Sequence, residues 1–266
     1  MNEIENILKR VRDTKALEFG VGAMKKIPAM FDSLFPGKTA VVVADKITYE
    51  IAGKIVYGYL NDAGINTDHP FVFTDPGLYA EWSYLEQLES YLKGRDVIAV
   101  AVGLGVINDL TKLASCHLGR RYIIVGTAAS MDGYTSYGAS VTYHGNKQTF
   151  DCPAPLGMVM DPAVAAKAPA GITASGYGDL IAKIPSGADW IIADAVGSES
   201  IDPFAFSLVQ KNLRDALSDP DAVAAGDVTA VGKLADELLM SGFAMQAILS
   251  SRPASGAEHL FSHYWD

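Results

Sequence analysis

The chain has 266 residues, of which 49% are hydrophobic, and its formal net charge is −10. This length can bury a substantial core in one large domain or two smaller ones. The acidic balance argues against a general polyanion binder such as a DNA-coating protein, so we expect no nucleic-acid partner. Two cysteines are too few for a disulfide scaffold and predict a reducing, cytoplasmic compartment. The acidic N-terminus predicts that there is no signal peptide, and the lack of an apolar run of about 18 residues predicts that the chain does not insert into a membrane.

The first 160 residues alternate strand and helix signals. Apolar runs predict strands of a buried parallel sheet at Thr39–Ala44, Phe71–Phe73, Val97–Val102 and Tyr122–Val125. Helical patterns follow the first three of these runs, over Tyr49–Ala63, Glu81–Leu92 and about Asn108–Leu118. A hairpin of Ala139–Tyr143 and Gln148–Phe150 and a strand at Leu156–Met160 complete this part. The pattern predicts a doubly wound, mostly parallel α/β domain.

From Asp161 onward the sequence is rich in alanine and predicts only helices. These are expected at Pro162–Ala168, Ile172–Ile184, Pro203–Leu217 and within Asp221–Ser251. Asp161 is a suitable N-cap for a helix with Pro162 at its first position. We therefore expect a nucleotide-binding α/β domain over residues 1–160 and an all-α domain over residues 161–266.

The turn Gly103–Leu104–Gly105 follows a predicted strand and precedes a predicted helix. Glycines there let the backbone approach a phosphate, and the helix N-terminus would supply amide donors. The spacing lacks the third glycine of the common dinucleotide fingerprint, and such turns also occur without any ligand. Asp45, at the end of another strand, can accept hydrogen bonds from an adenosine ribose or simply cap the next helix.

Three further segments combine polar groups with unusual small residues. The loop of residues 127–136 contains Asp132 among hydroxyls and alanines, which suits phosphate and polyol binding. In Gly176–Tyr177–Gly178–Asp179, two glycines inside a predicted helix cost about 1 kcal/mol each, which indicates close approach of a ligand or another helix. A metal ion or a salt bridge to Lys183 would satisfy Asp179. His259 and His263 lie four residues apart on one helix face, a spacing that suits a shared site but is also common by chance.

Together these segments resemble the glycerol-1-phosphate dehydrogenases, within the larger family of glycerol dehydrogenases, iron-type alcohol dehydrogenases and dehydroquinate synthases. The resemblance extends over nearly the whole chain. It is carried by four segments in the same order: Gly103–Asp109, Thr127–Gly133 with Ser136, Gly176–Asp179, and Ser255–His259 with His263.

The resemblance implies an NAD(P)H-dependent reduction of dihydroxyacetone phosphate to sn-glycerol 1-phosphate, in which a divalent metal, Zn²⁺ or Ni²⁺, polarises the carbonyl. It implies that Asp179 and His259 bind the metal, and that Asp132, Asp179 and His263 serve catalysis, with Asp132 and His263 contacting substrate. The cofactor would be bound by Asp45, Gly103, Gly105, Val106, Ile107, Thr127, Ala128, Ser130 and Ser136.

Family members continue beyond the length of this chain, and their third metal ligand, another histidine, would fall after Asp266. We therefore expect an incomplete helical domain whose exposed apolar faces favour a homo-oligomer. The alternatives are a glycerol dehydrogenase, a dehydroquinate-synthase-like enzyme, or a nucleotide-binding protein without turnover.

Overall fold

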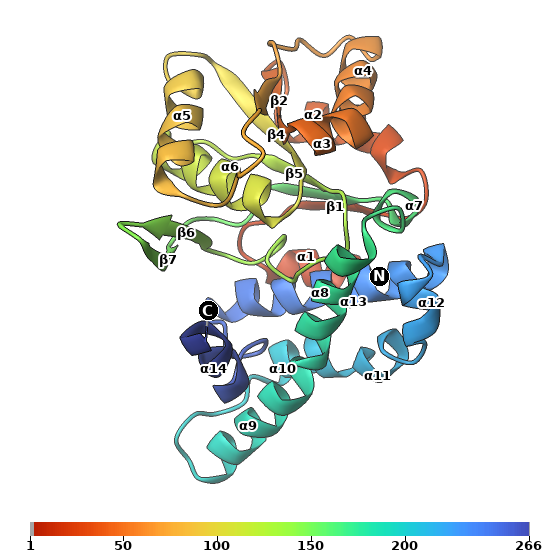
Figure 1. Cartoon of the computed structure of the whole chain (residues 1–266), viewed down its shortest axis with the longest axis vertical. Helices are drawn as coiled ribbons and strands as arrows, with labels where there is room; N and C mark the ends of the chain where they lie inside the picture. Colours follow the sequence, from red (N-terminus) through yellow and green to blue (C-terminus); the bar gives the residue numbers. More distant parts are fainter. Residues whose placement is uncertain (1–2, 266) are drawn as a thin grey trace. The chain divides into compact units, whose positions relative to one another are not determined.

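The computed structural model describes residues 3–265, without the side chains of residue 3 and of residues 262–265 (Figure 1). The chain forms two compact units. We call the first, made of Asp13–Ala128 and Gly138–Val164, the α/β unit. The second, called the helical unit, contains the residues up to Arg12, the loop Ala129–Tyr137 and the residues from Ala165 onward.

The α/β unit is built on a six-stranded sheet in which all neighbouring strands are parallel. Its order is β1-β8-β5-β4-β2-β3, with bounds β1 Ala16–Phe19, β2 Thr39–Asp45, β3 Phe71–Phe73, β4 Val97–Gly103, β5 Ile123–Gly126 and β8 Gly157–Met160. Every residue of the central strand β4 is buried, as its unbroken apolar run predicts. The predicted α/β class is confirmed, and the edge strand β1 is an addition that the sequence pattern did not reveal.

Helices connect these strands within the α/β unit. They are η1 Ala23–Lys26, α2 Ile27–Leu34, α3 Lys46–Thr48, η2 Tyr49–Gly53, α4 Lys54–Asp62, α5 Trp82–Leu92 and α6 Gly105–His117. The expected start of the last helix at Asn108 was wrong, because Leu104 is extended and the helix begins directly after it. Asp161 caps the short helix α7 Pro162–Ala165 by accepting a 3.0 Å hydrogen bond from Ala163 N, as predicted.

The predicted hairpin is present as β6 Ala139–Tyr143 and β7 Asn146–Phe150. Its turn is shorter than expected, because only His144 and Gly145 separate the strands. Both residues have positive φ, 51° and 77°, which matches the right-handed twist of the two strands.

The order of the strands places a switch point between β2 and β4. The chain leaves β2 for the edge strand β3, returns to β4 on the other side of β2, and continues from β4 to β5. Ligands of open α/β sheets bind at such a point, outside the carboxyl ends of the strands.

The helical unit is organised around the long helix α13 Val228–Ile248, which is buried along most of its length. Its other helices are α1 Glu3–Arg10, α8 Ala170–Ile181, α9 Lys183–Ala195, α10 Pro203–Gln210, α11 Leu213–Ala216, α12 Pro220–Ala224 and α14 Ala257–Trp265. The single helix expected over Pro203–Leu217 was wrong, because Lys211 and Asn212 separate α10 from α11. Likewise, Gly226 with φ 72° and the N-cap Asp227 separate α12 from α13.

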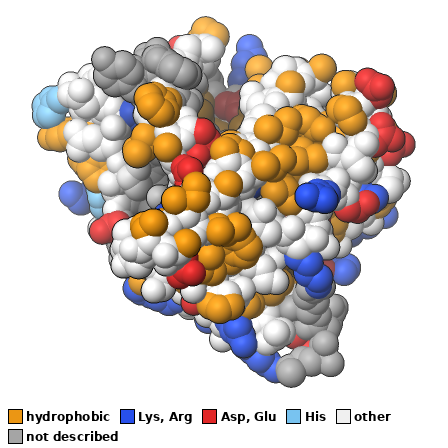
Figure 2. Space-filling model, turned by 90° about the horizontal axis from the view of Figure 1, so that it is seen from below, with side chains coloured by type: hydrophobic (Ala, Val, Ile, Leu, Met, Phe, Trp, Pro, Cys, Tyr) orange, Lys and Arg blue, Asp and Glu red, His pale blue; other side chains and the backbone are white. Residues whose placement is uncertain are grey.

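Exposed apolar side chains recur on three helices of the helical unit. Those on α8, α9 and α14 are Ile181, Ile184, Ile191, Ile192, Leu260 and Phe261, and Val196 directly follows α9. Figure 2 shows hydrophobic side chains gathered in patches on the face that it presents. Among the described helices, none combines the length and the hydropathy that a membrane span requires.

Candidate functional site

The carboxyl edge of the sheet brings three predicted cofactor-binding positions together. In the parallel register Val43 of β2 pairs with Ala101 of β4, and Gly103 of β4 pairs with Gly126 of β5. Asp45, Gly103 and Thr127 therefore lie at the ends of three neighbouring strands. Thr127 N also donates a 3.2 Å hydrogen bond to Gly103 O. These positions flank the switch point between β2 and β4.

The glycine turn lies directly before helix α6. No side chain caps this helix, whose first three residues are Gly105, Val106 and Ile107. The first amides of a helix have no partner within the helix, so this N-terminus offers donors for an anion. Gly103 also has a packing role, since a Cβ there would lie 2.8 Å from Ile107 Cγ1.

Asp45 caps a helix in this structure. Its carboxylate accepts hydrogen bonds from Ile47 N at 2.8 Å, Thr48 N at 2.9 Å and Thr48 Oγ1 at 2.8 Å. Asp45 N donates a 3.2 Å hydrogen bond back to Thr48 Oγ1, which completes a capping box. The capping alternative is therefore confirmed. A contact of Asp45 with a ribose stays a prediction.

Thr127 carries a hydroxyl that has no partner in the described structure. The residue is 5% exposed, and its Oγ1 is buried without a hydrogen bond. A buried hydroxyl without a partner costs free energy, so its presence at the end of β5 suits a bound polar ligand. Ala128, the next residue, is fully buried. The edge thus fits a dinucleotide, with Thr127 and the amides of α6 as the groups that would hold it.

In the helical unit, the loop Ala129–Tyr137 is fixed onto helix α13. Thr135 Oγ1 donates to Leu239 O at 2.8 Å, and Gln246 Nε2 donates to Thr135 O at 2.7 Å. A Cβ at Gly242 would overlap Thr135 Oγ1 and Asp132 O, so only glycine allows this contact.

The two serines predicted to line the cofactor belong to this loop. Ser130 Oγ lies 3.3 Å from Tyr134 Oη, and Ser136 Oγ donates to Gly133 O at 3.0 Å. Both hydroxyls therefore have contacts inside the loop, and their part in cofactor binding stays a prediction.

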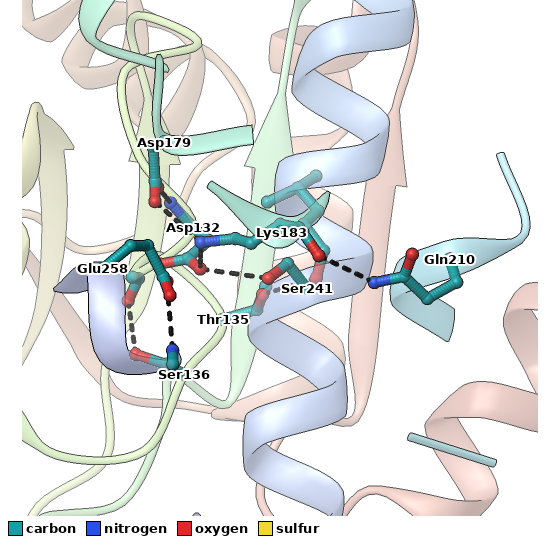
Figure 3. Close-up of polar contacts among 11 residues, drawn as sticks. Asp132, Thr135, Ser136, Asp179, Lys183, Gln210, Ser241 and Glu258 are labelled. Atoms are coloured by element: carbon teal, nitrogen blue, oxygen red, sulfur yellow. Dashed lines mark hydrogen bonds and ion pairs between the residues drawn. The ribbon is translucent and has the colours of Figure 1, made fainter. Parts of the chain in front are cut away.

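Asp132, Asp179 and Lys183 form a compact ionic cluster in the helical unit (Figure 3). Lys183 Nζ lies 2.7 Å from Asp132 Oδ2 and 2.7 Å from Asp179 Oδ1. Asp179 Oδ2 accepts a 2.9 Å hydrogen bond from Asp132 N, and Asp132 Oδ2 accepts a 3.0 Å hydrogen bond from Ser241 Oγ. The salt bridge that the sequence offered as one alternative for Asp179 is present.

Burial sets the electrostatics of this cluster. The side chain of Lys183 is 1% exposed, against 15% for Asp132 and 20% for Asp179. Burial and the neighbouring Asp132 carboxylate raise the pKa of Asp179 to about 6, although Lys183 opposes this shift. Burial alone would lower the pKa of Lys183, but the two carboxylates outweigh it and hold that pKa above its usual value. The ammonium is therefore charged at neutral pH.

Gly176 explains how helix α8 brings Asp179 to the loop. A Cβ at this position would overlap the carbonyl oxygen of Ala129 and lie 3.0 Å from Ser130 Cα. Gly176 thus makes a close approach, although its neighbour is a loop and not the ligand or helix that was predicted. At Gly178 a Cβ would meet no atom within 4 Å, so a ligand contact there stays a prediction.

The segment Ser255–His259 begins helix α14. Asp189 Oδ2 on α9 accepts a 2.9 Å hydrogen bond from Ala257 N, and Glu258 Oε1 accepts one of 3.0 Å from Gly256 N. A Cβ at Gly256 would lie 2.7 Å from carboxylate oxygens of both acids, which accounts for the glycine. His259 is half-buried on this helix. His263 belongs to the same helix, and its side chain lies outside the described residues.

The predicted metal ligands are not assembled for metal binding in the described part of the chain. Those residues contain no group of three His, Cys, Asp or Glu side chains that could hold an ion. Both oxygens of Asp179 are already engaged, one by Lys183 and the other by Asp132 N. The arrangement therefore does not fit a divalent metal as it stands, and the ligand roles of Asp179 and His259 stay predictions.

Sequence reasoning missed the groups that support the cluster. Ser241 and Gln246 come from helix α13, far along the chain from the loop that they bond. Gln210 Nε2 donates to Lys183 O at 2.9 Å. Only the spacing of Asp179 and Lys183, one helical turn apart, carried a signal in the sequence.

Comparison with solved structures shows the same fold in several oxidoreductases. A probable glycerol dehydrogenase from Sinorhizobium meliloti 1021 matches 89% of this chain and 66% of its own, with a TM-score of 0.71 and 23% identity. A maleylacetate reductase from Rhizobium sp. strain MTP-10005 matches 95% of this chain and 67% of its own, with a TM-score of 0.73 and 16% identity. The family model of iron-containing alcohol dehydrogenases matches residues 18–169.

Sequence relatives define the family more narrowly. A glycerol-1-phosphate dehydrogenase (NAD(P)⁺) from Halalkalibacterium halodurans is 36% identical over 228 residues, which are 85% of this chain and 57% of the relative. A protein of the same name from Methanosarcina mazei is 33% identical over 93% of this chain and 68% of its own length. The chain thus spans between about half and two thirds of these relatives. It belongs to the glycerol-1-phosphate dehydrogenase family of oxidoreductases.

Proposed function

We propose that this chain binds NAD(P)H at the carboxyl edge of its sheet and reduces dihydroxyacetone phosphate to sn-glycerol 1-phosphate. The observation that carries this proposal is the level of identity, 33% and 36% to named glycerol-1-phosphate dehydrogenases over most of the chain. Solved structures named glycerol dehydrogenase or maleylacetate reductase are only 16–23% identical and support the fold alone.

NAD(P)H, when bound, supplies the hydride. The first amides of α6 would hold the pyrophosphate, because no side chain caps them and the helix dipole favours negative charge. The buried hydroxyl of Thr127 would donate a hydrogen bond to the dinucleotide. Asp45 would contact the adenosine ribose and disfavour the 2′-phosphate of NADP by charge repulsion.

In the helical unit, we propose that Asp132 contacts substrate. Its carboxylate is partly exposed while Ser241, Lys183 and the fixed loop hold it in one orientation. An oriented carboxylate accepts hydrogen bonds from hydroxyl groups, and dihydroxyacetone phosphate offers one such group. His263 is assigned to the substrate by the resemblance. The described residues do not assemble a site for a metal.

The exposed apolar side chains of α8, α9 and α14 support the proposal that the chain forms a homo-oligomer. Multi-angle light scattering over a range of protein concentrations measures this directly. A mass equal to one chain at every concentration would contradict it.

The function is tested by following NADH oxidation with dihydroxyacetone phosphate, in parallel with and without added Zn²⁺ or Ni²⁺. Plain dihydroxyacetone serves as the matched control, because it lacks only the phosphate. We expect faster oxidation with the phosphorylated substrate. Equal rates would favour a glycerol dehydrogenase, and no oxidation despite NADH binding would favour a nucleotide-binding protein without turnover.

A further inference from the structure

The two carboxylates of the ionic cluster, Asp132 and Asp179, already pair with a cation of the chain itself, the ammonium of Lys183. Lys183 Nζ lies 2.7 Å from one oxygen of Asp132 and 2.7 Å from one oxygen of Asp179. The lysine is held in this position from several sides, because it is buried on α9 and its carbonyl accepts a hydrogen bond from Gln210. The ammonium reduces the charge of the pair from −2 to −1.

We propose that Lys183 is a built-in competitor of divalent metal ions for the Asp132–Asp179 pair, and that it sets the affinity of this chain for metal. The proposal rests on the proposed function only in its choice of Zn²⁺ and Ni²⁺ as the ions.

The exposure of the three side chains makes competition possible. Asp132 and Asp179 keep 15% and 20% of their side-chain surface exposed, whereas Lys183 keeps 1%. An ion from solvent can therefore reach the carboxylates without passing the lysine. It must then displace the ammonium from Asp179 Oδ1 or bind beside its positive charge, and repulsion between cations is strong where water is largely excluded.

Replacing the lysine tests the competition. In Lys183→Met the side chain keeps a similar length and loses its charge, so no ammonium competes for the oxygens of Asp132 and Asp179. We expect isothermal titration calorimetry to show at least tenfold tighter binding of Zn²⁺ and Ni²⁺ than in the unchanged chain, which corresponds to about 1.4 kcal/mol. Lys183→Arg keeps the charge and should show no such gain.

Two further variants locate the effect. Lys233→Met is the matched control, because Lys233 also pairs with an aspartate in the helical unit but is 48% exposed. It should leave metal affinity unchanged. In the double variant Lys183→Met with Asp179→Asn, the gain should disappear.

Lys183→Met leaves two close carboxylates without their counter-charge, so its folding must be measured as well. Thermal unfolding followed by circular dichroism should show a larger rise in Tm on adding Zn²⁺ for Lys183→Met than for the unchanged chain. If Lys183→Met does not fold, the same comparison is made with Lys183→Gln. Equal metal affinity and equal Tm shifts in the unchanged chain and the neutral variant would overturn the proposal. A gain that survives Asp179→Asn would overturn it too. NADH oxidation tests the proposed function separately.

Discussion

The contact between helix α8 and the loop Ala129–Tyr137 predicts opposite effects for two glycines of one helix. A Cβ at Gly176 would overlap the Ala129 carbonyl oxygen and lie 2.8 Å from its carbon. These are backbone atoms, which cannot rotate away. At Gly178 a Cβ would meet nothing within 4 Å. Gly178→Ala is therefore the matched control for Gly176→Ala.

The expected difference follows from two contributions. Each substitution gains up to about 1 kcal/mol from the higher helix propensity of alanine. Gly176→Ala also incurs an overpacking cost of about 1–3 kcal/mol, near the upper end because the contacted atoms are backbone. We expect Gly178→Ala to be slightly more stable than the unchanged chain, and Gly176→Ala to be about 2–3 kcal/mol less stable than Gly178→Ala.

The stability of both variants is measured by urea unfolding, followed by circular dichroism and by tryptophan fluorescence, to which the buried Trp190 of the helical unit contributes. Equal midpoints for the two variants, with equal slopes, would refute the close packing of α8 on the loop.

Three other predictions concern the α/β unit. Thr127→Val removes a buried hydroxyl that has no partner, so we expect the ligand-free chain to become more stable in urea unfolding. NADH binding, measured by fluorescence titration, should become roughly five- to tenfold weaker, which is the value of one hydrogen bond. Unchanged binding would show that Thr127 does not contact the cofactor. Asp45→Ser keeps a capping side chain but not the charge, so the preference for NADH over NADPH should fall while stability changes little. Asp45→Ala should show the same fall in preference and also lose about 1 kcal/mol of stability in urea unfolding. An unchanged preference in both variants would show that Asp45 only caps the helix. Burial raises the pKa of Asp109 to about 6, although the charge of Lys112 opposes this shift, so ionisation of Asp109 lowers the free energy of unfolding by at most about 3 kcal/mol as pH rises from about 4 to 6. Asp109→Asn should flatten this decline in urea midpoints measured across the same pH range. An equally steep decline in the variant would contradict the raised pKa of Asp109.

The sequence predicted the central sheet well because strands buried on both faces carry unbroken apolar runs. β4 is the clearest example. The edge strand β1 was missed because its four residues are only half-buried and include Glu18, so no such run marks it. The start of helix α6 was predicted less accurately, because the extended conformation of Leu104, which precedes it, cannot be recognised from the hydrophobic periodicity.

The ionic cluster was only partly predictable for a different reason. The spacing of Asp179 and Lys183 is local and can be read from a helical pattern. Asp132 and Ser241 reach the cluster from a loop and from a distant helix, through contacts that depend on the glycines at positions 176 and 242. Such contacts are set by tertiary packing. Sequence spacing therefore indicated one half of the cluster and left the other half to the structure.

We propose that this chain reduces dihydroxyacetone phosphate with hydride from NAD(P)H. The most direct measurement is the stereochemistry of the product formed from dihydroxyacetone phosphate and NADH, resolved by a coupled assay specific for each enantiomer of glycerol phosphate. We expect sn-glycerol 1-phosphate in an amount equal to the NADH consumed. Formation of sn-glycerol 3-phosphate, or no product while NADH is bound, would contradict it.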